Sequence, residues 1–234
     1  MIKAVFFDLG DTLIHSKVQA LEMRGSTIAA FFHSEGLPLT PQDATEILNS
    51  LRPNEPKGAG NCYGAWFRVE RTRIAAMATH LGLSLPVAML DAMTLRFRRF
   101  LSVRTQVFED TLPTLQKLRE MQLHISVISN NDGRSVIHIE HHGLTPWLDH
   151  VIDSAAFGCT KPNCDIYKYA LSRAGVEPHE AVMVGDSATS DAQGGVDAGL
   201  YGFWLNRKGD KQHPDPRVKT IQSLIELPDL LAGL

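Results

Sequence analysis

The chain has 234 residues, of which 44% are hydrophobic and 21% charged, and its formal net charge is −3. These values are ordinary for a soluble globular protein and accommodate one large domain, or one domain that carries a sizeable insertion. The small negative charge gives no reason to expect nucleic acid or an anionic membrane as a partner, and no apolar run approaches the ~20 residues that a membrane helix needs.

The cysteine content bears on the compartment. Three cysteines, Cys62, Cys159 and Cys164, make a poor disulfide framework. We therefore expect free thiols in a reducing environment, which predicts a cytoplasmic location. The N-terminal apolar run is too short for a signal peptide, and Asp8 and Asp11 interrupt it.

The first predicted element is a strand at residues 4–7, a continuous apolar run of the kind found in strands buried on both faces of a parallel sheet. Asp8 ends this run, and a carboxylate so close to a buried strand is costly unless another group pairs with it. Gly10 allows the backbone to turn sharply after it. Because ligands in open α/β sheets bind at such strand ends, this turn is a candidate site.

The following part of the chain, to about residue 101, has helical spacing and no convincing strand pattern. Four helices are predicted there, at residues 17–34, 42–51, 65–81 and 86–101. Thr40 and Pro41 form an N-cap followed by proline at the first helical position, and residues 52–64 read as a loop rich in proline and glycine. Four consecutive helices suggest a helical bundle inserted after the first strand.

From residue 107 onward, strands and helices alternate. The predicted strands are residues 124–128, 151–152, 181–184 and 202–205. The predicted helices are residues 111–121, 134–142, 166–174, 190–198 and 223–231. Repeated β–α units imply a parallel sheet with right-handed crossovers, to which the first strand belongs. We therefore predict an α/β fold, with a Rossmann-like parallel-sheet core and an inserted four-helix bundle.

Polar residues follow three of the predicted strands, at the rim where parallel strands end. They are Asp8, Ser129, Asn130 and Asp186, with Asp191 in the next helix and Lys161 ahead of another helix. Carboxylates, one lysine and one hydroxyl make a balanced site for magnesium (Mg²⁺) and a phosphoryl group, because hard oxygen ligands suit Mg²⁺. The metal and Lys161 would neutralise the charge that keeps an anionic phosphate away from a carboxylate nucleophile.

Four segments resemble, in order and spacing, the signature motifs of the haloacid dehalogenase-like (HAD) superfamily: residues 8–12, 129–130, 161 and 185–191. The resemblance covers residues 2–13 and about 107–205, and the helical insertion resembles the cap domain of that family. It implies a Rossmann-like catalytic core of residues 1–15 and 103–234 and a helical cap domain of residues 16–102.

The resemblance also implies roles for individual residues. Asp8 would be the nucleophile. Ser129 and Asn130 would bind the transferring phosphoryl group, and Lys161 would hold nucleophile and phosphate together. The metal ligands would be Asp8, the backbone carbonyl of Gly10, Asp186 and, directly or through water, Asp191.

One position departs from the family pattern. Phosphatases of the family usually carry a second aspartate two residues after the nucleophile, as general acid and base. Here that position is Gly10, and Asp11 follows one place later. General acid–base help contributes roughly 10²–10⁴-fold, so its loss is expected to slow turnover without abolishing phosphoryl transfer. Asp11 or a water molecule remain open as substitutes.

This departure leaves other functions open. The 2-haloacid dehalogenases of the superfamily also lack the second aspartate, but they carry a tyrosine there, use no metal and generally lack the acidic metal ligand. This chain keeps Asp186, and an unneutralised carboxylate beside Asp8 would raise one of the two pKa values and weaken the nucleophile. Phosphonatases need a cap lysine, for which Lys57 is the one loop candidate. A catalytically weak module that binds phosphate or a protein is a further alternative.

The interpretation is a Mg²⁺-dependent phosphohydrolase that acts on a small phosphomonoester through an aspartyl-phosphate intermediate. Its partner is a small-molecule phosphorylated substrate, which the sequence does not name, and the oligomeric state is likewise not encoded in a readable pattern.

His138 and His142 lie four residues apart on a predicted helix. They are interpreted as a helical surface cluster rather than a metal site, since no third ligand is evident.

Overall fold

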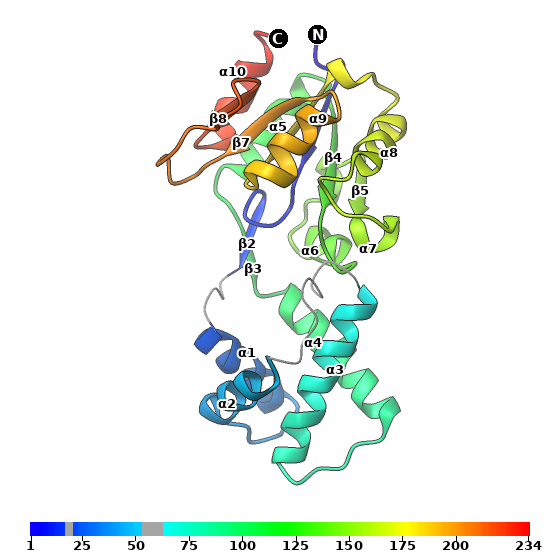
Figure 1. Cartoon of the computed structure of the whole chain (residues 1–234), viewed down its shortest axis with the longest axis vertical. Coiled ribbons are helices and arrows are strands. Elements are labelled where there is room, and N and C mark those ends of the chain that lie inside the picture. The colour runs from blue at the N-terminus through cyan, green and yellow to red at the C-terminus, as the bar shows by residue number, and fades with distance from the viewer. Residues whose placement is uncertain (17–20, 53–62) are drawn as a thin grey trace. The chain divides into compact units, whose positions relative to one another are not determined.

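A computed structural model describes residues 1–16, 21–52 and 63–234 (Figure 1). The start of the first predicted helix, most of the predicted loop, Lys57 and Cys62 lie outside the described residues. The chain divides into two compact units. The first unit comprises residues 1–15 and 106–234, and the second comprises residues 16–105.

A six-stranded parallel sheet forms the centre of the first unit, with strand order β5-β4-β1-β6-β7-β8. The strands are β1 (Ala4–Phe7), β4 (His124–Ser129), β5 (His150–Asp153), β6 (Ala181–Gly185), β7 (Tyr201–Leu205) and β8 (Val218–Ile221). The predicted parallel α/β fold is therefore confirmed. β8 was not predicted, because this edge strand buries only its two end residues and has polar ones between them.

Helices cover both faces of the sheet. They are α5 (Thr111–Glu120), α6 (Ser135–His141), α7 (Ser154–Phe157), α8 (Cys164–Ala174), α9 (Gly194–Asp197) and α10 (Leu227–Leu231). Alternate residues of β1 enter opposite layers, with Val5 and Phe7 in one apolar cluster and Ala4 and Phe6 in the other. α5, α6 and α10 contribute to the first cluster and α8 to the second. Burial on both faces explains the continuous apolar run of β1.

Several predicted elements differ in detail from the structure. The predicted helix at 190–198 is a π-helical turn, Ala188–Gln193, followed by the short α9. The predicted C-terminal helix divides into a 3₁₀ turn, Leu224–Glu226, and α10, whose first turn contains Pro228. A two-stranded sheet of β2 (Ile14–Ser16) and β3 (Thr105–Val107) was not predicted. Three-residue strands are too short to show a periodic pattern.

The second unit contains four helices within its described residues: α1 (Leu21–Ser34), α2 (Pro41–Leu51), α3 (Tyr63–His80) and α4 (Val87–Ser102). The Thr40 hydroxyl accepts a hydrogen bond from the Asp43 N–H at 3.1 Å, which is the predicted N-cap of α2. Phe31, Phe97 and other apolar side chains form a separate core for this unit. No helix in the described ranges has both the length and the apolar character that crossing a membrane requires.

Candidate active site

The predicted site residues of the first unit come together at one edge of the sheet. β1 pairs with β4 and β6 in parallel register, Phe7 lying opposite Val127 and Val184. The strands therefore end at the same edge, where a pocket of about 330 Å³ opens. Its lining residues are Asp8, Gly10, Asp11, Ser129, Asn130, Asn131, Lys161, Asp186, Ser187, Ser190 and Asp191. Every site residue predicted from the sequence thus lines one pocket, although these residues come from widely separated parts of the chain.

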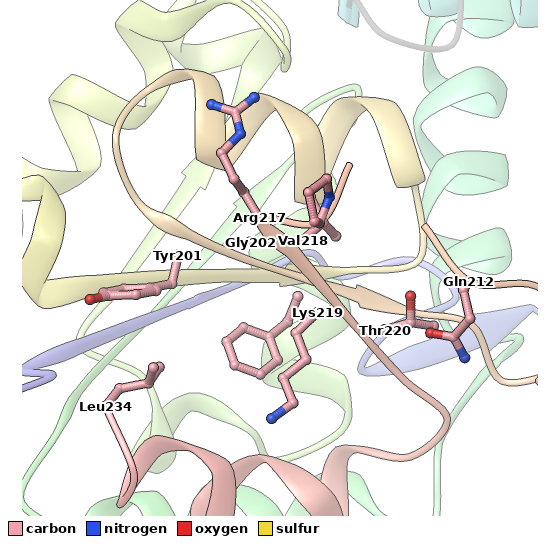
Figure 2. A pocket seen from close by; sticks show the side chains of 10 residues that line it. Tyr201, Gly202, Gln212, Arg217, Val218, Lys219, Thr220 and Leu234 are labelled. Carbon is pink, nitrogen blue, oxygen red and sulfur yellow. The ribbon is translucent and has the colours of Figure 1, made fainter. Parts of the chain in front are cut away.

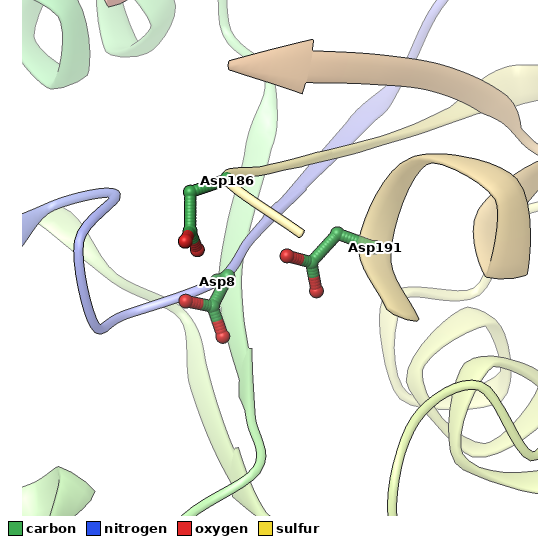
Figure 3. Close-up of side chains that lie close together, drawn as sticks. All are labelled: Asp8, Asp186 and Asp191. Carbon is green, nitrogen blue, oxygen red and sulfur yellow. The ribbon is translucent and has the colours of Figure 1, made fainter. Parts of the chain in front are cut away.

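Three carboxylates define this pocket. One oxygen each of Asp8, Asp186 and Asp191 lies within 4.8 Å of the other two (Figure 3). Asp8 and Asp191 are buried, whereas Asp186 is exposed. Among the described residues, no second group of three or more His, Cys, Asp or Glu side chains is close enough to hold a metal.

The ammonium group of Lys161 lies between two of these carboxylates. Its Nζ is 2.7 Å from Asp8 Oδ1 and 2.6 Å from Asp191 Oδ1. The side chain is 1% exposed. Burial by itself lowers the pKa of Lys161, but the Asp8 and Asp191 carboxylates outweigh it, so the pKa is raised and the lysine stays charged.

The site as a whole is short of positive charge. Burial, countered in part by Lys161, and the neighbouring Asp191 raise the pKa of Asp8 to about 7. Partial burial and the carboxylates of Asp191 and Asp11 raise the pKa of Asp186 to about 6. Burial is the largest cause of both shifts, and Lys161 offsets burial and the neighbouring carboxylates only in part.

The donor set fits a divalent cation. All three side chains offer hard oxygen ligands, which Mg²⁺ prefers. Mg²⁺–oxygen distances of ~2.0–2.1 Å place the ligands of one ion at most ~4.2 Å apart. The oxygens of Asp8, Asp186 and Asp191 lie within 4.8 Å of one another, so at most a small contraction or one bridging water would let all three hold the same ion.

Asn130 holds the main chain of Lys161. Its Nδ2 donates to the Lys161 carbonyl at 2.9 Å, and its Oδ1 accepts from the Lys161 N–H at 2.8 Å. This paired contact joins the end of β4 to the segment that precedes α8. The side chain of Asn130 therefore positions the lysine, and its predicted contact with phosphate stays a prediction.

Asp191 is held in place by its own turn. Its Oδ2 accepts from the Ser187 N–H at 3.0 Å, and the Ser187 hydroxyl in turn accepts from the Ser190 N–H at 3.0 Å. A Cβ atom at position 185 would overlap the Asp191 carboxylate. The π-helical turn and Gly185 together let this carboxylate approach the end of β6, and π-turns are common at functional sites.

The turn after β1 differs from the expectation for Gly10. The left-handed residue is Asp11, with a φ of 52°, whereas Gly10 has no positive φ. Aspartate tolerates this conformation better than most residues. A Cβ at Gly10 would meet no atom within 4 Å, so neither space nor backbone geometry demands glycine there. Both residues line the pocket.

Thr12 and Trp204 contact the main chain of Asp186. The Asp186 N–H donates to the Thr12 hydroxyl at 3.1 Å, and the Trp204 indole N–H donates to the Asp186 carbonyl at 2.8 Å. The sequence predicts that Thr12 can hydrogen-bond amides of its own turn, whereas its contact with Asp186 and the contact made by Trp204 were not predicted. No spacing signal connects a tryptophan on β7 to the turn after β6, because adjacency in a sheet is a tertiary property.

The burial of His138 corrects one further prediction. His138 is buried, so the interpretation of His138 and His142 as a surface cluster is wrong for His138.

A second cavity of about 420 Å³ lies at the β7–β8 edge (Figure 2). It is lined by Tyr201, Gly202, Phe203, Gln212, Pro216, Arg217, Val218, Lys219, Thr220 and Leu234. It contains no carboxylate side chain, so the smaller pocket is the candidate active site.

Comparison with known proteins places this geometry in context. The family model for haloacid dehalogenase-like hydrolases matches residues 2–199. A protein of Methanocaldococcus jannaschii named glyceraldehyde 3-phosphate phosphatase is 28% identical, over 100% of this chain and 99% of its own. The solved structure of a 2-haloacid dehalogenase from Pseudomonas syringae is similar with a TM-score of 0.75, at 23% identity over 100% of this chain and 99% of that one. A HAD phosphatase from Thermococcus onnurineus has a TM-score of 0.67, at 26% identity over 99% of both chains.

Proposed function

The chain belongs to the haloacid dehalogenase-like hydrolase family, and we propose that it is a Mg²⁺-dependent phosphatase that hydrolyses a small phosphomonoester through an aspartyl-phosphate on Asp8. The observation that carries this proposal is the position of Asp8. Its carboxylate lies 2.7 Å from the Lys161 ammonium and beside two further carboxylates that could hold a metal ion. A nucleophile for an anionic ester requires positive charge of this kind next to it.

Asp8 attacks phosphorus in its ionised form. Burial works against that form, and Lys161 works for it. Bound by Asp8, the Gly10 carbonyl, Asp186 and Asp191, Mg²⁺ would supply the remaining positive charge on the nucleophile and the phosphoryl oxygens. Lys161 stays charged between its two carboxylates and stabilises the charge that gathers on the transferring group.

Ser129, the last residue of β4, and Asn130, which follows it, support the transfer of the phosphoryl group. Ser129 is the last residue of β4, is buried and lines the pocket, so its hydroxyl is available to hydrogen-bond a phosphoryl oxygen. Asn130 fixes the Lys161 main chain. After the alcohol has left, water hydrolyses the aspartyl-phosphate. Because Gly10 has no carboxyl group, Asp11 or water provides the proton for the departing alcohol.

The relatives support a small phosphorylated substrate. The relative from M. jannaschii is named for glyceraldehyde 3-phosphate, and the Escherichia coli protein named pyrimidine 5′-nucleotidase YjjG is 38% identical over 46% of this chain. We propose triose phosphates and nucleoside monophosphates as the first compounds to assay. We also propose that residues 16–102 form a cap domain that selects the substrate, while residues 1–15 and 103–234 form the catalytic core.

The decisive experiment measures hydrolysis of an aryl phosphate by the full chain, with and without Mg²⁺. We expect turnover that needs Mg²⁺ and is lost in Asp8→Asn. Asp165→Asn is a matched control, since Asp165 is an exposed carboxylate of α8 that does not line the pocket. Release of halide from a 2-haloacid without metal would identify a dehalogenase instead. Binding of inorganic phosphate with no turnover of any phosphoester would identify a binding module.

A further inference from the structure

The end of β7 contacts both turns that carry the site carboxylates. Trp204 on β7 donates its indole N–H to the Asp186 carbonyl at 2.8 Å. Arg207, two residues beyond β7, donates from Nη2 to the Thr12 carbonyl at 2.8 Å. Thr12 in turn accepts the Asp186 N–H at 3.1 Å. Through these bonds, one strand end joins the turn after β1 to the turn after β6.

Arg207 is itself firmly anchored. Its guanidinium makes two hydrogen bonds to the Asp110 carboxylate, at 2.8 and 3.0 Å, and lies 3.7 Å from the centre of the Phe108 ring. Asp110 also accepts from the Ser223 hydroxyl at 2.8 Å and from the Leu224 N–H at 2.9 Å. A planar guanidinium can make this two-pronged contact and still donate to a third acceptor, whereas a lysine ammonium presents no such fork.

We propose that Arg207, anchored by Asp110, is a positioning residue that sets the separation between the Asp8 turn and the Asp186 turn. It does not line the pocket, so it acts on the carboxylates through Thr12, whose hydroxyl accepts from the Asp186 N–H at 3.1 Å and donates to Asp186 Oδ1 at 3.5 Å. The expected effect of Arg207 on Mg²⁺ affinity rests on the proposed function, because both concern the same site. Groups that orient metal ligands without contacting the metal themselves typically contribute roughly 10–100-fold to metal affinity or activity.

The first unit provides a matched comparison. Arg119 of α5 makes a two-pronged contact with Asp149, at 2.9 and 3.1 Å, and Asp149 accepts the Ile125 N–H at 2.8 Å. This pair stands at the opposite edge of the sheet, where β4 and β5 begin. Both pairs are arginine–aspartate forks with an additional backbone donor, and the Arg119–Asp149 pair is the more exposed of the two. If ion pairing alone stabilised the fold, removing either pair would have the same effect on the site.

The test compares two double variants, Arg207→Met/Asp110→Asn and Arg119→Met/Asp149→Asn. Removing both partners avoids a buried unpaired charge, and asparagine keeps an acceptor for the Leu224 or Ile125 N–H. Amide hydrogen exchange of the metal-free chain is followed at Asp186 and at Leu13, whose N–H donates to the Leu9 carbonyl. We expect exchange at least about tenfold faster at Asp186 and Leu13 in the first variant, and unchanged exchange there in the second.

The second readout is Mg²⁺ affinity together with the rate of phosphate ester hydrolysis. We expect the dissociation constant for Mg²⁺, measured by calorimetry without substrate, to rise about 10–100-fold in the Arg207 variant, with a matching fall in kcat for an aryl phosphate. Trp204→Phe, which keeps an aromatic ring and removes the indole N–H, should produce a smaller change in the same direction. Arg207→Lys should fall between the wild type and the double variant, and it replaces the double variant if that one does not fold.

Equal behaviour of the two double variants at Asp186, in exchange and in Mg²⁺ binding, would overturn the positioning role while leaving the phosphatase proposal intact. If the wild-type chain neither binds Mg²⁺ nor hydrolyses any phosphoester, the proposed function is wrong. In that case the exchange comparison alone decides whether Arg207 positions the Asp186 turn, since it requires no ligand.

Discussion

Gly185, the last residue of β6, lies against the Asp191 carboxylate so closely that a Cβ atom at position 185 would overlap it. The carboxylate also accepts hydrogen bonds from the Ser187 N–H at 3.0 Å and from Lys161 Nζ at 2.6 Å. It therefore has no room to yield without breaking one of these bonds. The absence of a side chain at position 185 is thus a condition for the site itself.

Gly185→Ala should displace Asp191 and with it the Lys161 ammonium. We expect kcat for an aryl phosphate to fall at least about tenfold and Mg²⁺ affinity to weaken, because both depend on how the Asp191 carboxylate is oriented. The measurement is steady-state kinetics with a Mg²⁺ titration. Gly233→Ala is the control, since its nearest neighbour would be an ordinary contact at 3.7 Å. Wild-type kinetics in Gly185→Ala would show that catalysis does not depend on the position of the Asp191 carboxylate.

The thermal stability of the metal-free chain should depend on pH through Asp8 and Asp186. Their folded pKa values, about 7 and about 6, lie above the ordinary value of 3.8. The folded chain therefore binds protons that the unfolded chain does not, and stability from these groups is lost as pH rises toward 7. His124 acts in the opposite direction, because burial lowers its folded pKa, so its contribution falls as pH decreases.

Two comparisons isolate the carboxylates from His124. In Asp8→Asn, the loss of melting temperature between about pH 5 and about pH 8 should be smaller than in the wild type, because one of the titrating groups is gone. Mg²⁺ should raise the melting temperature of the wild type more at the higher pH than at the lower, since its binding requires ionised ligands. Metal stabilisation that is equal at both pH values would contradict the charge balance described for this site.

Asn130→Ala should act through Lys161. Without the two side-chain bonds to its main chain, the lysine is held less well, and we expect kcat to fall by about tenfold with a smaller change in KM. If Asn130 instead contacts phosphate directly, KM should rise more than kcat falls. Asn163→Ala, which removes only the N-cap of α8, controls for a general loosening of the segment between Lys161 and α8.

Gly10→Asp should add the carboxyl group that this turn lacks. The position is exposed and lines the pocket, and a Cβ atom added there would have no other atom within 4 Å, so the side chain fits without strain. We expect faster turnover of alkyl phosphates, whose leaving alcohols need a proton, by roughly tenfold or more. Aryl phosphates should gain less, because their leaving groups depart more readily.

The comparison of substrates decides this prediction. Equal effects of Gly10→Asp on aryl and alkyl phosphates would show that proton donation to the leaving group is not what limits the wild-type enzyme. Asp11→Asn measured on the same two substrates distinguishes the two open sources of the proton. A selective loss on alkyl phosphates identifies Asp11, and no loss identifies water.

The parallel sheet and the carboxylates at its edge could be predicted from local pattern. The apolar run ending at Asp8 predicts a doubly buried strand, and the strands ending at Ser129 and Gly185 repeat that pattern. Because parallel strands end at a common edge, the order of these segments suffices to bring Asp8, Ser129 and Asp186 together. The strands that were not predicted, β2, β3 and β8, are three or four residues long, and their pairing depends on neighbours rather than on their own residues.

The supporting contacts depended on the tertiary structure. The bonds from Asn130 to Lys161 and from Trp204 to Asp186 join residues on different strands and loops, and no periodicity marks them. The same holds for the backbone conformation of the Asp8 turn, where Asp11 rather than Gly10 is left-handed. The amino-acid sequence alone determined which polar side chains stand at the strand ends, because strand periodicity is a local property. Only the folded chain decided how they are held and charged, because hydrogen bonds across the sheet and burial depend on packing between distant segments.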